Sequence, residues 1–291
     1  MGVIGRFKTG FVLTKQTVEM LWNNPRLAVF PAVSGAASLA FIAALLTPLL
    51  GVFVLDADGA VAVVGLLTVA GLYLGTAFIS AFFAAALVDQ TRAVLDGDEP
   101  SLRQGVRAAW GVKRQLFVWA IISATVGFVL DSINESSNSG VTQIISAVIG
   151  VAWTVLTFFV VPVIVFERPS VRGMFTRSGE LFKQTYGETP ISLIGTAVLA
   201  LLLGLPLLGP GLYALFELEL LAVGIPLVVA GLAVVQLTTY TLRGIVKTGL
   251  YFYAVEGDRP DEFAAMFDEL DTVREAENRN EDIGPGLGGF R

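Results

Sequence analysis

Two sets of polar side chains stand out in this sequence, because the long runs around them are almost entirely apolar. The first set is Thr157, Gln236 and Thr239, which lie inside uncharged runs. Hydroxyl and amide groups in such places can bind the polar part of a substrate, since an amide both donates and accepts hydrogen bonds. Hydroxyls in apolar helices usually bond back to their own helix or to a neighbour. Packing is therefore the favoured role, and an intramembrane polar site is the alternative.

The second set consists of charged residues at the ends of three apolar runs. Its members are Asp89, Arg92, Glu167, Arg168, Arg243 and Lys247. If these ends lie at one depth, the six side chains could form a ring of ion pairs at the inner face that binds lipid headgroups. The favoured interpretation is that they are solvated boundary charges, which follow the retention of basic residues on the cytoplasmic side of a membrane.

The chain lacks the residues on which most catalytic and metal sites depend. It contains no Cys and no His, which removes thiolate nucleophiles, disulfides, the usual zinc ligands and the commonest proton shuttle near neutral pH. The interiors of the apolar runs also lack the charged residues that mark pumps and coupled transporters. We therefore predict no catalytic residue, no cofactor and no metal site, and we expect that the chain is not an enzyme. A lipid-processing enzyme that uses the charged ring is the third alternative.

The apolar runs themselves predict an all-α polytopic membrane bundle. The sequence is 54% hydrophobic and 15% charged, which is more apolar than a soluble core of this length requires. A helix needs about 20 apolar residues to cross a hydrocarbon core of about 30 Å. Six runs meet or approach this length, and we predict transmembrane helices at residues 27–55, 60–88, 116–133, 141–166, 191–216 and 220–242.

The distribution of basic residues predicts the orientation of the six spans. All 19 Lys and Arg fall in the N-terminal segment, in 89–115, in 167–190 or after residue 242. The alternate connections contain none, so both termini are predicted to be cytoplasmic in a multi-pass protein of the cell membrane. Asn138→Cys should then react with an impermeant label from outside, whereas Ser178→Cys should not. The glycosylation sequon at Asn134 would lie outside, although so short a pattern is usually coincidental.

A repeated exit motif follows the second, fourth and sixth spans. Each copy has a charged residue, then Pro, then Ser or Asp, in the segments 97–103, 167–172 and 257–262. Proline disfavours helix in the residue before it, and Ser101, Ser170 or Asp261 can cap the helix that follows. Gln104 would complete a capping box in the first copy. The pattern predicts three repeated hairpins, each followed by an amphipathic cytoplasmic helix. The alternative is that the three similar motifs arose separately and do not mark a repeat.

The chain then divides into three parts. Residues 1–255 form the predicted six-span domain, which begins with an amphipathic helix. Residues 256–277 carry apolar side chains at helical spacing among many acidic residues, which predicts an acidic amphipathic helix. Residues 278–291 are polar and rich in Gly, so they are predicted to be a flexible tail.

Several short segments resemble an uncharacterised family of multi-span membrane proteins found in archaea and bacteria. The segments that carry the resemblance are Gly105-Val-Arg-Ala-Ala-Trp110, Ala124-Thr-Val-Gly127, Ala152-Trp153, Thr157-Phe-Phe-Val-Val-Pro162, Arg177-Ser178, Leu181-Phe-Lys183, Tyr186-Gly-Glu188 and Leu250-Tyr-Phe-Tyr-Ala254. They are specific as a set and cover nearly the whole chain up to Phe263. The resemblance implies the membrane fold and supplies no catalytic residue, because the family has no assigned function.

Two functions remain open from the sequence. The first is a non-enzymatic protein that organises or binds lipid and protein partners at the inner leaflet through its amphipathic helices. The alternative is a permease or flippase for an apolar or amphipathic substrate, built on spans broken at Pro162, Pro206 and Pro226. Membrane lipid, a protein partner and a second copy of the chain are the expected partners. Nucleic acid is not expected, since the basic residues follow the predicted topology.

Overall fold

The computed structural model describes residues 17–54, 58–136, 140–185 and 189–256, and this part of the chain contains helices and no strand. The contacts divide the chain into two units. The first unit comprises residues 24–184, and the second comprises the described parts of residues 1–23 and 185–291.

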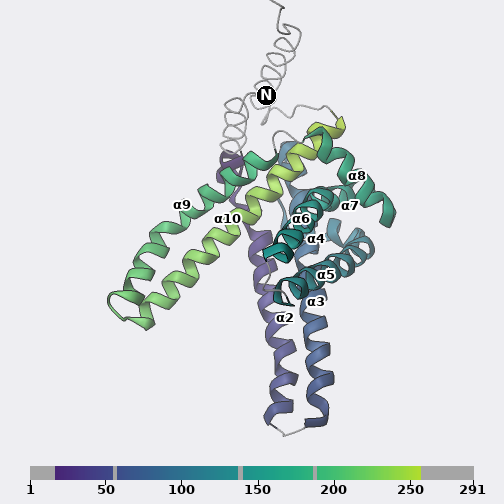
Figure 1. The fold of residues 1–291 in the computed structure, drawn as a ribbon. Helices are drawn as coiled ribbons and strands as arrows, with labels where there is room; N and C mark the ends of the chain where they lie inside the picture. Colours follow the sequence, from purple (N-terminus) through teal and green to yellow (C-terminus); the bar gives the residue numbers. More distant parts are fainter. Residues whose placement is uncertain (1–16, 55–57, 137–139, 186–188, 257–291) are drawn as a thin grey trace, which may run out of the picture. The chain divides into compact units, whose positions relative to one another are not determined.

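The first unit is organised around one long helix, α3. In chain order the unit contains the 3-10 turn η1 (Pro25–Ala28), α2 (Val29–Val54), α3 (Asp58–Leu95), α4 (Leu102–Gly111), α5 (Lys113–Ser136), α6 (Gly140–Thr157), α7 (Val160–Glu167) and α8 (Val171–Gln184). Helix α3 packs against α2, α4, α5 and α7 (Figure 1). Its 38 residues correspond to about 57 Å at 1.5 Å per residue, which leaves room for several neighbours along its length.

Glycines on α3 allow the close contact between α2 and α3. A methyl group added to Gly71 would lie 3.2 Å from Cδ1 of Leu45, and one added to Gly75 would overlap the ring of Phe41. Small residues let membrane helices approach each other closely where lipid supplies no hydrophobic drive between them. The Gly71 and Gly75 pair therefore serves a contact within the chain.

The fourth predicted span is interrupted at Phe158 and Phe159, between α6 and α7. Pro162 explains the position of the break. It has no N–H to donate to the carbonyl of Phe158, and its ring clashes with that carbonyl in a continuous helix. As the third residue of α7, Pro162 lies in the first turn, where a missing N–H costs nothing. The helices continue through Pro48, Pro206 and Pro226.

The exit after α7 follows the sequence prediction closely. Arg168 leaves the helix in the left-handed conformation, with φ of 48°, and Pro169 follows it. Ser170 then caps α8, because its Oγ accepts a hydrogen bond of 3.2 Å from the N–H of Gly173. The predicted cap at Ser170 is confirmed.

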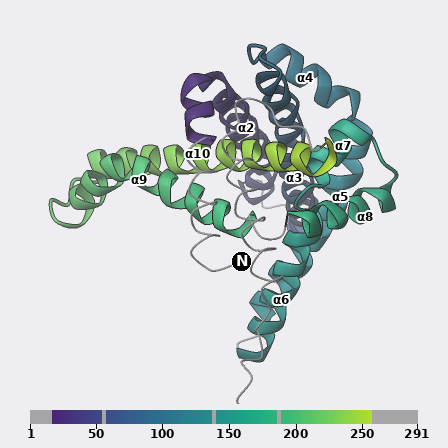
Figure 2. The same cartoon turned by 90° about the horizontal axis from the view of Figure 1, so that it is seen from above.

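The second unit is dominated by two antiparallel neighbours, α9 (Thr189–Phe216) and α10 (Leu221–Glu256), which lie side by side in both views (Figures 1 and 2). Two glycines on each helix form their contact. A methyl group on Gly211 would lie 2.9 Å from the backbone N of Val228, and one on Gly231 would lie 3.0 Å from the backbone N of Leu208. Both distances are to backbone atoms, which cannot turn aside as a side chain can. A larger residue at either position would therefore force the helices apart.

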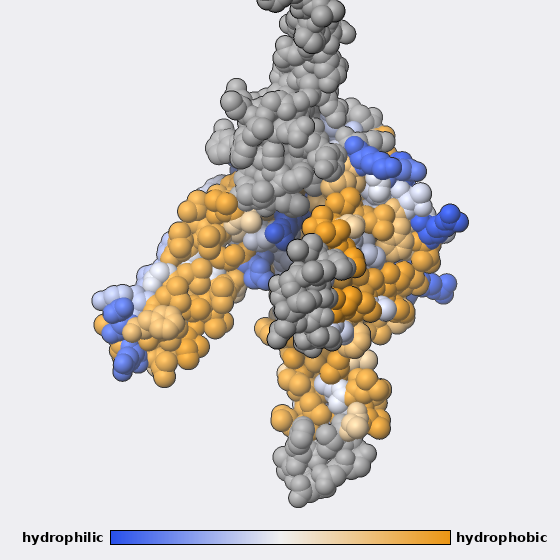
Figure 3. Space-filling model, viewed as in Figure 1, coloured by the Kyte–Doolittle hydropathy of each residue, from blue (hydrophilic) through white to orange (hydrophobic). Residues whose placement is uncertain are grey.

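Six helical segments in the described part of the chain are long and apolar enough to cross a membrane, the fourth being made of α6 and α7 together. They cover Pro25–Gly51, Ala62–Leu95, Lys113–Ile133, Ser146–Glu167, Thr196–Phe216 and Leu221–Val255. The predicted class, an all-α multi-span membrane fold, is confirmed. Figure 3 shows apolar surface along the long helices, as lipid contact requires. The arrangement in three hairpins and the amphipathic character of the surface helices stay predictions.

Some predictions concern residues outside the described ranges. These are most of the N-terminal helix, the acidic helix after residue 256, the tail at 278–291, the third exit motif at 257–262 and the labelling position Asn138. Ser178 is described and is fully buried. Ser178→Cys is therefore a poor topology reporter, since burial alone would protect the thiol from a label.

Candidate functional site

The candidate site is the end of the first unit at which α3 and α7 end and α4 and α8 follow them. Gln90, near the end of α3, is buried and connects this helix to α4. Its Oε1 accepts a hydrogen bond of 2.6 Å from the backbone N–H of Ser101, and its Nε2 donates to Oδ2 of Asp89 at 2.9 Å. One side chain thus fixes the start of α4 relative to the end of α3.

The capping box predicted at Ser101 and Gln104 is wrong. Ser101 does hold the N-cap position of α4, but its side chain makes no capping hydrogen bond, and Gln104 points to an exposed position. In a capping box the third helical residue would reach back to the N–H of the cap. Here Gln90 of α3 already occupies that N–H, so a tertiary contact replaces the local motif.

Gly105 brings α4 close to α3. A methyl group at this position would lie 2.7 Å from Cε1 of Phe30, 2.9 Å from the carbonyl oxygen of Ala86 and 2.9 Å from Cγ of Gln90. The inner side of α4 therefore touches the backbone of α3 directly. This contact leaves the opposite side of α4 open to its surroundings.

The open side of α4 combines basic residues with one large aromatic residue. Arg103, Arg107 and Trp110 are exposed and lie four and three residues apart, so they share one face of the helix. Trp110 is 59% exposed. Lys113, the first residue of α5, adds a third cation, with Nζ 4.0 Å from the centre of the Trp110 ring. We name these four residues the α4 surface.

Charged residues predicted for the inner-face ring have partners close by in the first unit. Arg92 pairs with Asp96 at 2.9 Å, one helical turn away. Glu167 accepts two hydrogen bonds from Nε of Arg177, at 3.0 and 3.2 Å, which ties the end of α7 to α8. Arg168 is exposed at the end of α7.

Asp89 also lies in the first unit and accepts the hydrogen bond from Gln90, whereas the last two ring members belong to the second unit. Arg243 is exposed and Lys247 is half-buried, and both lie on α10. The ring therefore combines residues of both units, and it stays a prediction.

The interrupted span has its own internal support. The N–H of Phe159, freed by the break, donates a hydrogen bond of 3.0 Å to Oγ of Ser178 on α8. Both residues are fully buried. A buried amide without a partner is costly, so Ser178 stabilises the break and links it to α8. Phe158 and Phe182 pack edge to face beside this bond, with ring centroids 5.8 Å apart.

The predicted intramembrane polar residues are also divided between the units. Thr157 ends α6 and donates to the carbonyl oxygen of Trp153 at 2.7 Å, which is the bond within one helix that we favoured for such hydroxyls. Gln236 is exposed on α10, and Thr239 is half-buried on the same helix. Ser123, Thr125 and Thr154 bond to carbonyl groups of their own helices as well.

Gln90 was not among the predicted site residues, and no structural role was predicted for Ser178. A common signal marks both residues, because each is a small or medium polar residue on a helix face that is otherwise buried. Ser178 lies four residues from the buried Met174 and Phe182, and Gln90 lies four residues from the buried Ala86. A polar residue at such a position needs a partner on a neighbouring element.

The charged and polar residues at this end can be compared with the requirements of a metal site. Among the described residues, no three His, Cys, Asp or Glu side chains come close enough to hold a metal ion. The charged and polar groups at this end form structural links and an outward basic surface. The fold and the site are those of a multi-span helical membrane protein.

Comparison with known proteins places the chain in a family. Residues 31–260 match the family of unknown function DUF6159, and the chain belongs to this family. The comparison with curated proteins found no match, and the comparison with solved structures found none. The family assignment agrees with the resemblance seen in the sequence.

Proposed function

We propose that this chain is a non-enzymatic membrane protein that binds lipid, and through it protein partners, at the inner leaflet of the cell membrane. The α4 surface is the observation that carries the proposal. Arg103 and Arg107 offer guanidinium groups for phosphate oxygens, and Trp110 offers an aromatic ring of the kind enriched at the boundary between headgroups and hydrocarbon. All three are exposed on one side of a short helix.

The position of α4 supports the same role. The helix follows directly on the span Ala62–Leu95, and another span begins at Lys113. A helix between two spans cannot move far from the membrane boundary. The contacts of Gln90 and Gly105 hold its inner side against α3, so the basic and aromatic side chains have a fixed direction. Such preorganisation reduces the entropy lost when a ligand binds.

Transport is the alternative function, and the break between α6 and α7 is the feature that would serve it. Broken helices can present free backbone groups to a substrate. Here the freed N–H of Phe159 is bonded to Ser178 and is buried, which supports a structural role for the break. Vesicles that contain the protein and a fluorescent phospholipid test the alternative. If the protein is a flippase, the probe should equalise between the two leaflets faster than it does in protein-free vesicles.

The lipid-binding proposal is tested with the full chain in nanodiscs of phosphatidylglycerol and phosphatidylcholine in equal parts. Native mass spectrometry after detergent release measures which lipids stay bound. Each basic residue near an anionic membrane contributes about 1 kcal/mol. Arg103→Gln combined with Arg107→Gln should therefore lower the ratio of retained phosphatidylglycerol to phosphatidylcholine by up to about 30-fold.

Gln104→Ala is the matched control, since Gln104 is exposed on the same helix and uncharged. It should leave the ratio unchanged. If the double variant retains the wild-type ratio, lipid binding by the α4 surface is excluded.

A further inference from the structure

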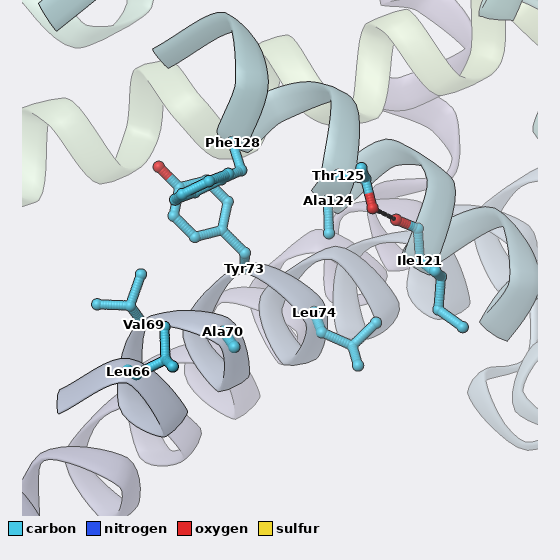
Figure 4. A pocket seen from close by; sticks show the side chains of 9 residues that line it. All are labelled: Leu66, Val69, Ala70, Tyr73, Leu74, Ile121, Ala124, Thr125 and Phe128. Atoms are coloured by element: carbon cyan, nitrogen blue, oxygen red, sulfur yellow. Dashed lines mark hydrogen bonds between the residues drawn. The ribbon is translucent and has the colours of Figure 1, made fainter. Parts of the chain in front are cut away.

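An apolar groove of about 350 Å³ lies between α3 and α5 of the first unit. Leu66, Val69, Ala70 and Leu74 form its α3 wall, and Ile121, Ala124 and Thr125 form its α5 wall, as Figure 4 shows. Leu66 is 71% exposed, so the groove opens sideways from the helices. Both helices contribute candidate membrane spans, which places the opening toward lipid.

The groove offers no free polar group along its walls. Its only hydroxyl besides that of Tyr73 belongs to Thr125, and this group donates to the carbonyl oxygen of Ile121 at 2.8 Å. An occupant therefore gains contact with hydrocarbon surface alone, and a polar occupant would lose its own hydrogen bonds.

A polar contact crosses the groove between the two helices, within the length of its α3 wall. The hydroxyl of Tyr73 on α3 donates to Oδ2 of Asp131 on α5 at 2.9 Å. The ring of Tyr73 also packs edge to face against Phe128, with centroids 5.6 Å apart (Figure 4). Asp131 is the charged residue at which the apolar run of α5 ends, whereas Tyr73 lies inside the candidate span Ala62–Leu95.

The dimensions decide between a lipid chain and a protein helix as the occupant. From Leu66 to Leu74 the α3 wall is about 12 Å long, which is close to half of a hydrocarbon core of about 30 Å. The groove volume is about 350 Å³, whereas a helix of this length and about 10 Å in diameter occupies on the order of 900 Å³. An α-helix with side chains is about 10 to 12 Å wide and cannot enter, whereas an extended hydrocarbon chain can.

We propose that this groove binds one acyl chain of a membrane lipid within a single leaflet. This site differs from the α4 surface in its residues and in its chemistry, because it recognises hydrocarbon and the α4 surface recognises charge. The proposal therefore stands or falls independently of the function proposed above.

The test uses a phosphatidylglycerol that carries a diazirine in one acyl chain, with the full-length protein in nanodiscs. After illumination, mass spectrometry locates the adducts. Labelling of the peptides that contain residues 66–74 and 121–128 should saturate at a single lipid per chain, whereas labelling elsewhere should rise in proportion to the probe. Ala70→Phe fills the groove and should remove most of the saturable labelling.

Ala40→Phe is the control, because Ala40 is exposed on α2 and is not part of the groove. It should leave the labelling unchanged. Ala124→Leu narrows the groove from the other wall and replaces Ala70→Phe if that variant does not fold. Labelling that rises without saturation, or that survives both groove variants, overturns the proposal. So does a disulfide between Ala70→Cys residues of two copies, which would place a second chain in the groove.

Discussion

Ser178 provides a direct test of how the interrupted span is held together. Its Oγ accepts the 3.0 Å hydrogen bond from the N–H of Phe159, and both residues are fully buried. In Ser178→Ala the amide stays buried and loses its partner, which costs about 1–3 kcal/mol of unfolding free energy. For a unit the size of residues 24–184, each kcal/mol lowers the melting temperature by about 2–4 °C. The expected decrease is therefore roughly 6 °C.

Intrinsic tryptophan fluorescence of the full chain in detergent micelles can follow this transition. Trp119 and Trp153 stack with ring centroids 5.8 Å apart, and Phe175 of α8 lies 6.0 Å from both. Loss of contact between α8 and α6 would therefore change the signal.

Thr176→Ala serves as the control for this measurement. Thr176 is exposed on the same helix, and its hydroxyl donates to the carbonyl oxygen of Arg172 within that helix. A melting temperature of Ser178→Ala equal to that of Thr176→Ala would refute the claim that this bond stabilises the break.

Two further predictions concern α4 and the topology. Gly105→Ala should destabilise the protein by about 1–2 kcal/mol, because overpacking against the carbonyl of Ala86 outweighs the gain of about 1 kcal/mol in helix propensity. Gly111→Ala, whose added methyl group would lie 3.8 Å from Arg168, should be neutral or stabilising in the same melting assay, and equal effects of the two variants would contradict the packing argument. In the topology assay, Leu218→Cys should react with an impermeant maleimide in intact cells, whereas Glu180→Cys should react only after permeabilisation. Both positions are exposed and the chain has no other Cys, so the reverse pattern would overturn the predicted orientation.

The membrane class could be predicted from the sequence because it depends on local properties. Hydropathy over about 20 residues decides whether a helix can cross a bilayer, and each run carries that information without reference to its neighbours. The exit at Arg168, Pro169 and Ser170 was equally predictable, since proline and a capping hydroxyl act on residues adjacent in the chain.

The site was harder to predict, because its bonds join residues far apart in the sequence. Gln90 bonds to Ser101 only because α4 turns back on α3, and Ser178 reaches Phe159 across a separation of 19 residues. Tyr73 and Asp131 are separated by 58 residues. No local pattern selects these partners. At Ser101, the N–H that a capping box would use is bonded to Gln90 of α3 instead.

The lengths of α2 and α3 have a consequence for the surrounding bilayer. Their candidate spans contain 27 and 34 residues, or about 40 and 51 Å of helix, against a hydrocarbon core of about 30 Å. Such hydrophobic mismatch is relieved by tilting of the helices or by local thickening of the lipid. Because Gln90 fixes α4 to the end of α3, a change in bilayer thickness that tilts α3 would also change the angle of α4. The chain should therefore respond to the thickness of the membrane in which it resides.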